Sequence, residues 1–400
     1  MRSLKEKSKC LIFGEVCMEI SGYDRVNGVG VRNHVAVMAT VGCAGDAAER
    51  IVQLYPKAKL LVHLQGCAQT PPDIELVEKV LVNLALNPNV YSVLLVSLGC
   101  ESVNVDKVAD KISSAKNVEV VRVQERGLSN AISKGSEIVK KMCDEAEKVS
   151  RTKVDFSGIK VAIKCGASDS TSGIISNPVA GRVADMIIRE GGTVIFGETT
   201  EIIGAEHILA KRAIDDTVAR KMFTAIEEME KRAMSMGVDM RGGQPTGGNI
   251  KGGITTIEEK SLGAICKTGT SKLVDVIGYG DVPSKKGLIF MDSPGREIEA
   301  LTGFAAGGAQ IILFTTGLGA PQGFPIVPVI KISGNPEVCA RLNEHIDVDL
   351  SPVFYGKESL NEAAQRLFNE IVDVAAFKRT KAEILGYEKF FNIYVKGPVI

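Results

Sequence analysis

The chain has no tryptophan, and aromatic residues make up only 5% of its 400 residues. This scarcity disfavours a protein that stacks the bases of single-stranded nucleic acid on aromatic side chains. An excess of charge of one sign is also missing, because lysine plus arginine and aspartate plus glutamate both number 48. A balanced charge gives no electrostatic reason to bind nucleic acid or an anionic membrane. We therefore expect neither as a partner.

Long apolar runs are missing too. No stretch of about 18 apolar residues is present, which is the length that a membrane-spanning helix needs. The charged opening residues lead into no signal-peptide pattern. Nine cysteines in a long chain without such a signal are typical of reduced thiols. We expect a cytoplasmic protein.

Short runs rich in valine, isoleucine and leucine alternate with helical patterns along most of the chain. Such runs are typical of buried strands in a parallel sheet, so the sequence predicts an α/β fold with flanking helices. A chain of 400 residues exceeds the usual size of one core. We place the domain boundary in the polar stretch 151–157, which gives α/β domains at 1–150 and 151–400.

Four of the apolar runs end in a cysteine beside a glycine, and these cysteines are Cys43, Cys67, Cys100 and Cys165. Ligands of parallel sheets bind outside the carboxyl ends of the strands. Four thiols at four strand ends are therefore candidate ligands of one metal ion or cluster. The alternative is inert packing, because free cysteine is among the most buried residue types.

Two polar segments follow predicted strands. Ser168 and Asp169 lie in a turn rich in small hydroxyl residues, which predicts either an anion site or an ordinary capped turn. Glu198, Glu201 and Glu206 follow a later strand and suit metal ligation or acid–base work. The alternative for these carboxylates is a charged helix start, which the helix dipole favours.

Basic and amide side chains near glycine-rich turns are candidates for gripping a substrate. A guanidinium holds a carboxylate by two bonds, and a long glycine-rich loop is often functional. By this reasoning the substrate-binding candidates include Arg32, Asn33, Asn249, Lys251 and Lys331. The candidates for a catalytic base are His63, Glu206 and Lys260, and the sequence does not choose among them.

Several motifs together resemble the altronate and galactarate dehydratase family over residues 20–350. They include His63-Leu-Gln-Gly-Cys67, Leu98-Gly-Cys-Glu101, Cys165-Gly-Ala-Ser-Asp169 and Gly252-Gly-Ile-Thr-Thr-Ile-Glu-Glu-Lys-Ser-Leu-Gly263. Three positions depart from the family pattern. Ala167 stands where the family has glycine, and Leu318 stands where it has arginine. Ala264 stands where the family commonly has cysteine, with Cys266 two places later.

The resemblance implies a hydro-lyase that dehydrates a sugar acid to a 2-keto-3-deoxy acid with the help of iron. It also implies a dimerising first domain, hence a homodimer, and a Rossmann-like second domain. Full-length members carry a small β-clip (SAF-like) domain at the N-terminus, so a separate small β-clip subunit is an expected partner.

The iron that the resemblance implies could be bound in two forms. As a cluster it would use Cys43, Cys67 and Cys100, with Cys165 replacing one of them or lying beside the site. As a single Fe(II) ion it would use Glu198, Glu201 or His63. Two other functions remain open: the large subunit of a sulfolactate sulfo-lyase, which releases sulfite, and a non-catalytic metal scaffold.

Overall fold

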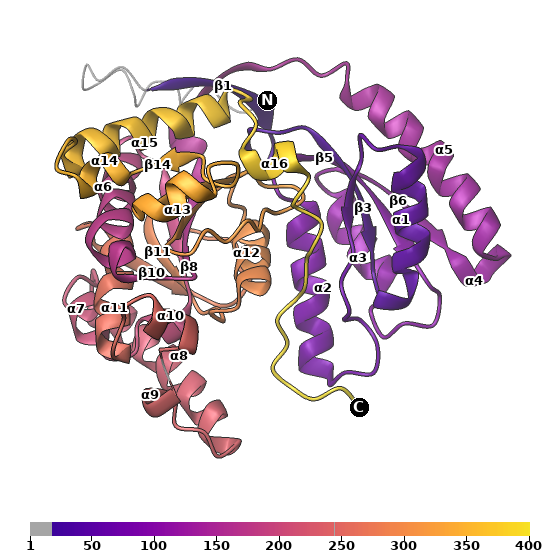
Figure 1. Cartoon of the computed structure of the whole chain (residues 1–400). Coiled ribbons are helices and arrows are strands. Elements are labelled where there is room, and N and C mark those ends of the chain that lie inside the picture. Colours follow the sequence, from indigo (N-terminus) through magenta and orange to yellow (C-terminus); the bar gives the residue numbers. More distant parts are fainter. Residues whose placement is uncertain (1–17, 244) are drawn as a thin grey trace.

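The computed structural model describes residues 18–243 and 245–400, and these residues form three sheets. Two of the sheets are parallel and have helices on both faces, so the α/β fold predicted from the sequence is confirmed. Figure 1 shows them as two lobes, with the early chain in one lobe and most of the later chain in the other.

The smaller parallel sheet has the strand order β4-β3-β5-β6. Its strands are β3 (His34–Ala39), β4 (Lys59–Leu61), β5 (Val90–Ser97) and β6 (Asn117–Arg122). The helices of this lobe are α1 (Gly45–Leu54), α2 (Pro71–Ala85), α3 (Val105–Ser113), α4 (Val123–Arg126) and α5 (Leu128–Ala146).

The larger parallel sheet has the strand order β10-β11-β9-β8-β12-β13-β14. Its strands are β8 (Lys160–Gly166), β9 (Thr193–Phe196), β10 (Leu273–Ile277), β11 (Gly287–Met291), β12 (Ile311–Thr316), β13 (Val329–Ser333) and β14 (Val348–Asp349). The longer helices around it are α6 (Asn177–Arg189), α8 (Asp216–Ser235), α11 (Ile257–Ile265), α12 (Glu297–Ala306) and α15 (Leu360–Ala375). Shorter ones are α7 (Glu206–Ala210), α9 (Met240–Gly243), α10 (Gly247–Lys251), α13 (Pro336–Arg341) and α14 (Ser351–Phe354).

Successive side chains of each strand point to opposite faces, and both faces are buried. In β3, Val35 and Val37 join a core with α1 and α5, whereas Ala36 and Met38 join a second core with α2. This second core also contains α12 and one face of the larger sheet. The helices α2 and α12 therefore pack between the two sheets, as Figure 1 shows.

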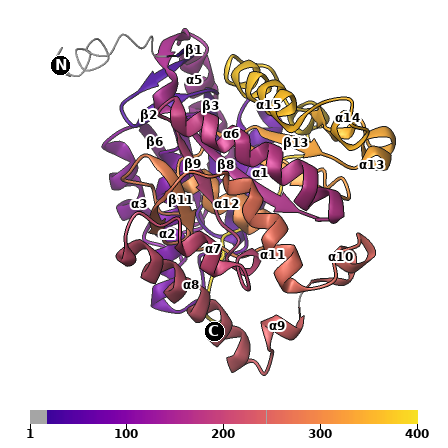
Figure 2. The ribbon, with the colours of Figure 1, turned by 90° about the vertical axis from the view of Figure 1, so that its left-hand side faces the viewer.

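The other face of the larger sheet forms a third core with α6, α8 and α15. Figure 2 shows this side, with α6 crossing the sheet and α11 leading toward α10. None of the helices in the described residues is long and apolar enough to cross a membrane.

One segment differs from its predicted form. The polar stretch 151–157, proposed as the domain boundary, contains β7 (Thr152–Asp155), which pairs antiparallel with β1 (Glu19–Arg25); β1 also forms a hairpin with β2 (Gly28–Gly30). The helical residues from Glu206 onward are divided into α7 and α8. The break comes where the Asp215 side chain accepts a hydrogen bond from Val218 N at 2.8 Å and so caps the start of α8.

The end of the chain returns to the smaller sheet. After α16 (Lys381–Leu385), residues 386–400 run past α2, as the yellow segment of Figure 1 shows. The Asp73 carboxylate accepts hydrogen bonds from Lys396 N and Gly397 N, both at 2.8 Å. Ile400 N donates to Ala68 O at 2.8 Å. The last residues thus lie next to the loop that carries Cys67.

Candidate active site

Five charged side chains form a chain of ion pairs at the carboxyl ends of β8 and β9. Lys164 Nζ lies 2.9 Å from Glu198 Oε1, and Lys267 Nζ lies 2.6 Å from Glu198 Oε2. Lys267 also contacts Glu201 Oε2 at 2.9 Å, and Glu201 Oε1 lies 3.9 Å from Lys260 Nζ. Three lysines alternate with two glutamates, so each carboxylate lies between two cations.

The ion pairs hold these groups in their charged forms despite their burial. Burial acts to raise the pKa of Glu198, but the positive charges of Lys164 and Lys267 outweigh it and lower that pKa. Burial acts to lower the pKa of Lys267, but Glu198 and Glu201 outweigh it and raise that pKa. Glu198 and Lys267 thus stay charged in the interior and contribute a constant electrostatic field.

Glu198 is held by its backbone as well as by its partners. Its φ of 68° and ψ of 67° are left-handed, a conformation that costs a non-glycine residue about 1–3 kcal/mol. Its backbone N donates to Ser293 Oγ at 2.8 Å. Such strain persists only where the surroundings enforce it and is frequent at active sites. We take it as a second sign that this end of the sheet is functional.

A cavity of about 320 Å³ opens at the outer end of the ion-pair chain. It is lined by the turn that follows β8, the start of α6 and residues of α11, among them Cys165, Ser168, Asn177, Lys260 and Cys266. Lys260 is the one cationic side chain among its described lining residues. Because Lys260 also contacts Glu201, it connects the cavity with the buried charges.

Cys165 faces this cavity as a thiol. Its Sγ lies 2.8 Å from Ser168 Oγ and 3.5 Å from Asn177 Nδ2. Burial raises the pKa of Cys165, which favours the protonated form over the thiolate that a metal would need. It also belongs to the larger sheet, whereas the other three cysteines belong to the smaller one. The prediction that all four thiols meet at one point is therefore wrong.

The turn after β8 has the geometry of a capped turn. Asp169 Oδ1 accepts bonds from Thr171 Oγ1 at 2.7 Å and Ser172 N at 3.0 Å, and its Oδ2 accepts from Asn335 Nδ2 at 2.8 Å. Asn249 Nδ2 donates to Ser168 O at 3.0 Å and holds the glycine-rich loop against the turn. Asp169 and Asn249 thus shape the cavity through protein contacts. Ser168 keeps its hydroxyl at the cavity.

The three cysteines of the smaller sheet lie on adjoining loops. Gly42 N donates to Gln65 O at 3.2 Å, which joins the Cys43 loop to the Cys67 loop. Ser102 N donates to Gly66 O at 3.0 Å, which joins the Cys100 loop to the Cys67 loop. All three thiols are exposed.

The donor chemistry of these thiols suits iron, but their placement in the structure does not. Thiolates are soft ligands that bind iron and its clusters. Across residues 18–243 and 245–400, however, no group of three or more His, Cys, Asp or Glu side chains is arranged to hold a metal ion. This also applies to Glu198 and Glu201, whose oxygens are occupied by lysines.

His63 has a structural role in place of the predicted catalytic one. It is only 1% exposed, its Nε2 bonds Ala39 O at 3.0 Å, and its Nδ1 accepts from Gln65 N at 3.1 Å. Burial lowers the pKa of His63 to about 4. Both ring nitrogens are used, so the ring is not available as a base.

Arg32 and Asn33 are also engaged within the protein. Arg32 donates to both carboxylate oxygens of Glu383, at 2.8 and 2.9 Å, and to three backbone carbonyls. Asn33 accepts from Arg25 and donates to Ala146 O at 2.7 Å. All five donors of Arg32 are used within the protein, so the prediction that Arg32 grips a substrate carboxylate is wrong in its physical basis. Asn33 uses its amide oxygen and one of its two N–H groups.

The other predicted residues lie away from the cavity. Lys331 is fully buried, its Nζ lies 3.3 Å from the centroid of the Phe314 ring, and that nitrogen has no hydrogen-bond partner among the described residues. Burial lowers the pKa of Lys331 well below its usual value, which disfavours the charged form that binding of a carboxylate would need. Glu206 bonds Gly204 N and contacts Arg241, and Lys251 is exposed at the end of α10.

Lys164 and Lys267 were not among the residues selected from the sequence. A signal for Lys164 existed, because it interrupts an otherwise apolar strand, and lysine is almost never fully buried without a partner. Lys267 gave no comparable signal, since it follows α11 in a polar turn. Its partners lie more than sixty positions away in the sequence.

Two family models together cover nearly all of the chain. The model described as D-galactarate/Altronate dehydratase, C-terminal, matches residues 156–398. The model described as D-galactarate dehydratase/Altronate hydrolase, second domain, matches residues 22–147. The chain belongs to the altronate and galactarate dehydratase family. The resemblance seen in the sequence motifs is thus confirmed.

Curated relatives of this family carry two kinds of name. The chain is 38% identical over 375 residues to the (2R)-sulfolactate sulfo-lyase subunit beta of Chromohalobacter salexigens, covering 92% of this chain and 95% of that one. It is 34% identical over 337 residues to the altronate dehydratase of Bacillus subtilis, covering 82% and 67%. It is 30% identical over 404 residues to the galactarate dehydratase of Escherichia coli, covering 94% and 77%. Both kinds of relative are lyases, and this chain is an enzyme of the lyase class.

Proposed function

We propose that the chain dehydrates a sugar acid to a 2-keto-3-deoxy acid and that the reaction takes place in the cavity lined by Lys260, Cys165 and Ser168. The observation that carries the proposal is the position of Lys260. It lines the cavity at the strand ends and contacts the buried chain of charges through Glu201. Ligands of open α/β sheets bind at such strand ends.

The reaction is a β-elimination without change of overall oxidation state. The carbon–hydrogen bond next to the carboxylate breaks, a base takes the proton, and the electron pair is held as an enediolate with the carboxylate. That pair then forms the carbon–carbon double bond as the carbon–oxygen bond at the next carbon breaks. Hydroxide leaves with the electron pair of the carbon–oxygen bond, and a proton converts it to water. The enol that remains rearranges to the keto acid. The chain has to move protons and stabilise the negative charge that develops on the substrate.

The residues of the cavity have separate parts in this proposal. Lys260 Nζ is the group that exchanges a proton with the substrate, because it is the basic side chain that lines the cavity. The Ser168 hydroxyl and the Cys165 thiol donate hydrogen bonds to substrate oxygens. The ions Lys164, Glu198 and Lys267 stay fixed and orient Glu201, which in turn positions Lys260.

We also propose iron as the cofactor, with Cys43, Cys67 and Cys100 as ligands after their side chains turn toward one another. Their loops already contact one another through the bonds of Gly42 and Gly66. An iron ion or cluster held by these thiols would supply Lewis-acid chemistry. We propose further that the enzyme is cytoplasmic, that two copies of the chain form a dimer, and that a separate small β-clip subunit completes it.

Release of sulfite from sulfolactate is a second candidate function. It is favoured by the match to a sulfo-lyase subunit over 95% of that subunit's length. This reaction breaks a carbon–sulfur bond in the same type of elimination. The leaving group therefore distinguishes the two functions.

The test is an assay of the anaerobically purified protein, with and without a candidate small subunit. Altronate, galactarate and (2R)-sulfolactate are supplied separately, and keto acid and sulfite are both measured. Keto acid from a sugar acid without sulfite supports the dehydratase. Sulfite from sulfolactate alone supports the second candidate. Absence of both products in the complete, iron-loaded complex contradicts both proposals.

A further inference from the structure

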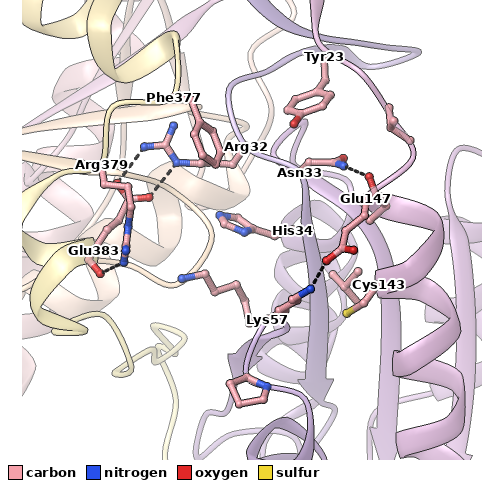
Figure 3. A pocket seen from close by; sticks show the side chains of 15 residues that line it. Tyr23, Arg32, Asn33, His34, Lys57, Cys143, Glu147, Phe377, Arg379 and Glu383 are labelled. Carbon is pink, nitrogen blue, oxygen red and sulfur yellow. Dashed lines mark hydrogen bonds and ion pairs between the residues drawn. The ribbon is translucent and has the colours of Figure 1, made fainter.

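A second and larger cavity, of about 510 Å³, lies at the amino-terminal ends of β3 and β4 (Figure 3). Its walls come from β1, from the residues that enter β3 and β4, from the end of α5, and from residues 377–383. The loops of Cys43 and Cys67 follow the opposite ends of the same two strands. This cavity shares no described lining residue with the cavity that contains Lys260.

The side chain of His34 lies in the middle of this cavity in Figure 3. Its backbone N bonds Asn89 O at 2.8 Å, but no described residue bonds either nitrogen of its ring. Burial, with the positive charges of Lys59 and Arg32, lowers the pKa of His34 well below its usual value. A neutral imidazole has one donor and one acceptor nitrogen. Here both face a space large enough for a small molecule.

The charge around His34 favours an anion. Four basic side chains line the cavity, namely Arg32, Lys57, Lys59 and Arg379, against the two carboxylates Glu147 and Glu383. The guanidinium of Arg32 has its five donors bonded within the protein, so it adds charge without a free donor. Lys59 is paired with Glu388, and its side chain is only 22% exposed.

The wall formed by the later part of the chain is strained. Phe377 has a φ of 90°, which is rare for a non-glycine residue, and the Arg32 guanidinium lies 5.3 Å from the centroid of its ring. Strained backbone at a cavity wall is typical of ligand-binding positions. Figure 3 shows Phe377 beside Arg32, close to the pair formed by Arg32 and Glu383.

We propose that this cavity binds a small oxyanion, such as a hydroxy acid or a phosphate, through hydrogen bonds to the ring of His34 and the charge of Lys59. A hydroxyl group of the ligand satisfies the acceptor nitrogen of the ring, and an oxyanion satisfies the donor nitrogen. The charge of Lys59 compensates the charge of the ligand, whereas Lys57 lies exposed at the rim of the cavity. The bound ligand lies between the smaller sheet and residues 377–383 and joins them.

Histidine NMR of the full chain tests this site directly, because the sequence has only four histidines. Glycerate and inorganic phosphate are titrated separately into protein labelled with carbon-13 in its histidine rings. The His34→Phe variant assigns the His34 signal. Binding is expected to shift that signal to saturation, and the anion that does so identifies the ligand class.

Two lysines provide a matched pair of variants. Lys59→Met is expected to weaken binding about tenfold or more, since it removes a charge inside the cavity. Lys57→Met is expected to change binding less than about twofold, because the Lys57 side chain is 74% exposed at the rim and its charge is screened. The signals of His63, His207 and His345 report whether each variant is folded.

Three outcomes would overturn the proposal. One is an unchanged His34 signal at high concentrations of both anions. Another is equal weakening by Lys57→Met and Lys59→Met. The third is loss of the His34 response in the Lys260→Met chain, because the site is independent of the proposed elimination. A retained response in that chain supports the oxyanion site whether or not the elimination proposal holds.

Discussion

Lys267 Nζ lies 2.6 Å from Glu198 Oε2, and both side chains are almost completely shielded from solvent. A buried ion pair is weak evidence of stability by itself, but removing one partner leaves the other ion uncompensated. Here Glu198 has cations on both sides, and Glu201 shares Lys267. Through Glu201, the pair therefore connects the carboxyl end of β9 to Lys260, which lines the cavity.

Lys267→Met is expected to destabilise the fold by about 3–5 kcal/mol, because it leaves Glu198 and Glu201 short of a positive charge. Urea unfolding followed by circular dichroism measures this change. Lys231→Met is the control, since the Lys231 side chain is 76% exposed and its pair with Glu227 is on the surface. Equal stability of the two variants would contradict the role given to the buried pair.

Lys260→Met is expected to abolish turnover, because Lys260 is the basic side chain that lines the cavity. It is expected to destabilise the fold less than Lys267→Met does, since Glu201 keeps Lys267 as a partner at 2.9 Å. Initial rates and urea unfolding of the same preparation check both parts. Lys251→Met, at an exposed position, serves as the control, and a comparable loss of rate there would count against the assignment.

Replacing Cys43, Cys67 and Cys100 by serine is expected to remove bound iron and turnover together, because serine is a poor ligand for iron. Iron and acid-labile sulfide are measured after anaerobic purification. Cys339→Ala is the control, since that buried thiol bonds Ser333 O at 3.3 Å and lies in another core. Full activity in a metal-free triple variant would exclude the three-thiol site.

Acid is expected to destabilise the chain through His63. Burial lowers the pKa of His63 to about 4, below its unfolded value of about 6.5. The unfolded state therefore takes up a proton first, and the stabilisation present above pH 6.5 is lost as the pH falls toward 4. The loss amounts to about 3 kcal/mol at most. Unfolding free energies between pH 7 and pH 4 should show a smaller slope in His63→Gln.

Lys331→Met is expected to stabilise the fold at pH 7. Burial lowers the pKa of Lys331 well below its unfolded value, so at pH 7 the cost of keeping this lysine charged in the interior favours the unfolded state. Methionine keeps most of the volume and removes a buried nitrogen that has no partner. A gain of about 1–3 kcal/mol is expected from thermal or urea unfolding. A decrease would mean that the amine has a partner when the enzyme is complete.

The sequence predicted the parallel α/β fold because strands buried on both faces appear in the sequence as short, continuous apolar runs. Runs such as Val161 to Ile163 are apolar on both faces, and cysteine next to glycine marked where the strands of the smaller sheet end. It did not predict which side chains pair across the fold. Glu198 was visible as a carboxylate after a strand, but its two lysine partners come from β8 and from the end of α11.

The same limit explains the errors about Arg32 and His63. A guanidinium and an imidazole are both common in substrate sites. In the sequence, Arg32 follows a glycine-containing turn and His63 follows an apolar run that predicts a strand. Most of the hydrogen-bond partners of Arg32 are far away in the sequence, in residues 374–383. The partners of His63 are backbone groups, which a sequence motif does not reveal. Lys260 was among the alternatives, and only the packing of α11 against the turn after β8 distinguishes it from His63 and Glu206.

The return of residues 386–400 to the smaller sheet means that the first lobe is not self-sufficient. Phe391 packs its ring against His63 at 5.4 Å, and Asp73 bonds two backbone groups of the final residues. A fragment comprising only the first lobe would expose these surfaces to water. Residues 386–400 follow the second lobe in the sequence but pack against the first. If the two lobes are produced as separate chains, the first lobe therefore needs these fifteen residues from the other chain in order to cover its surface.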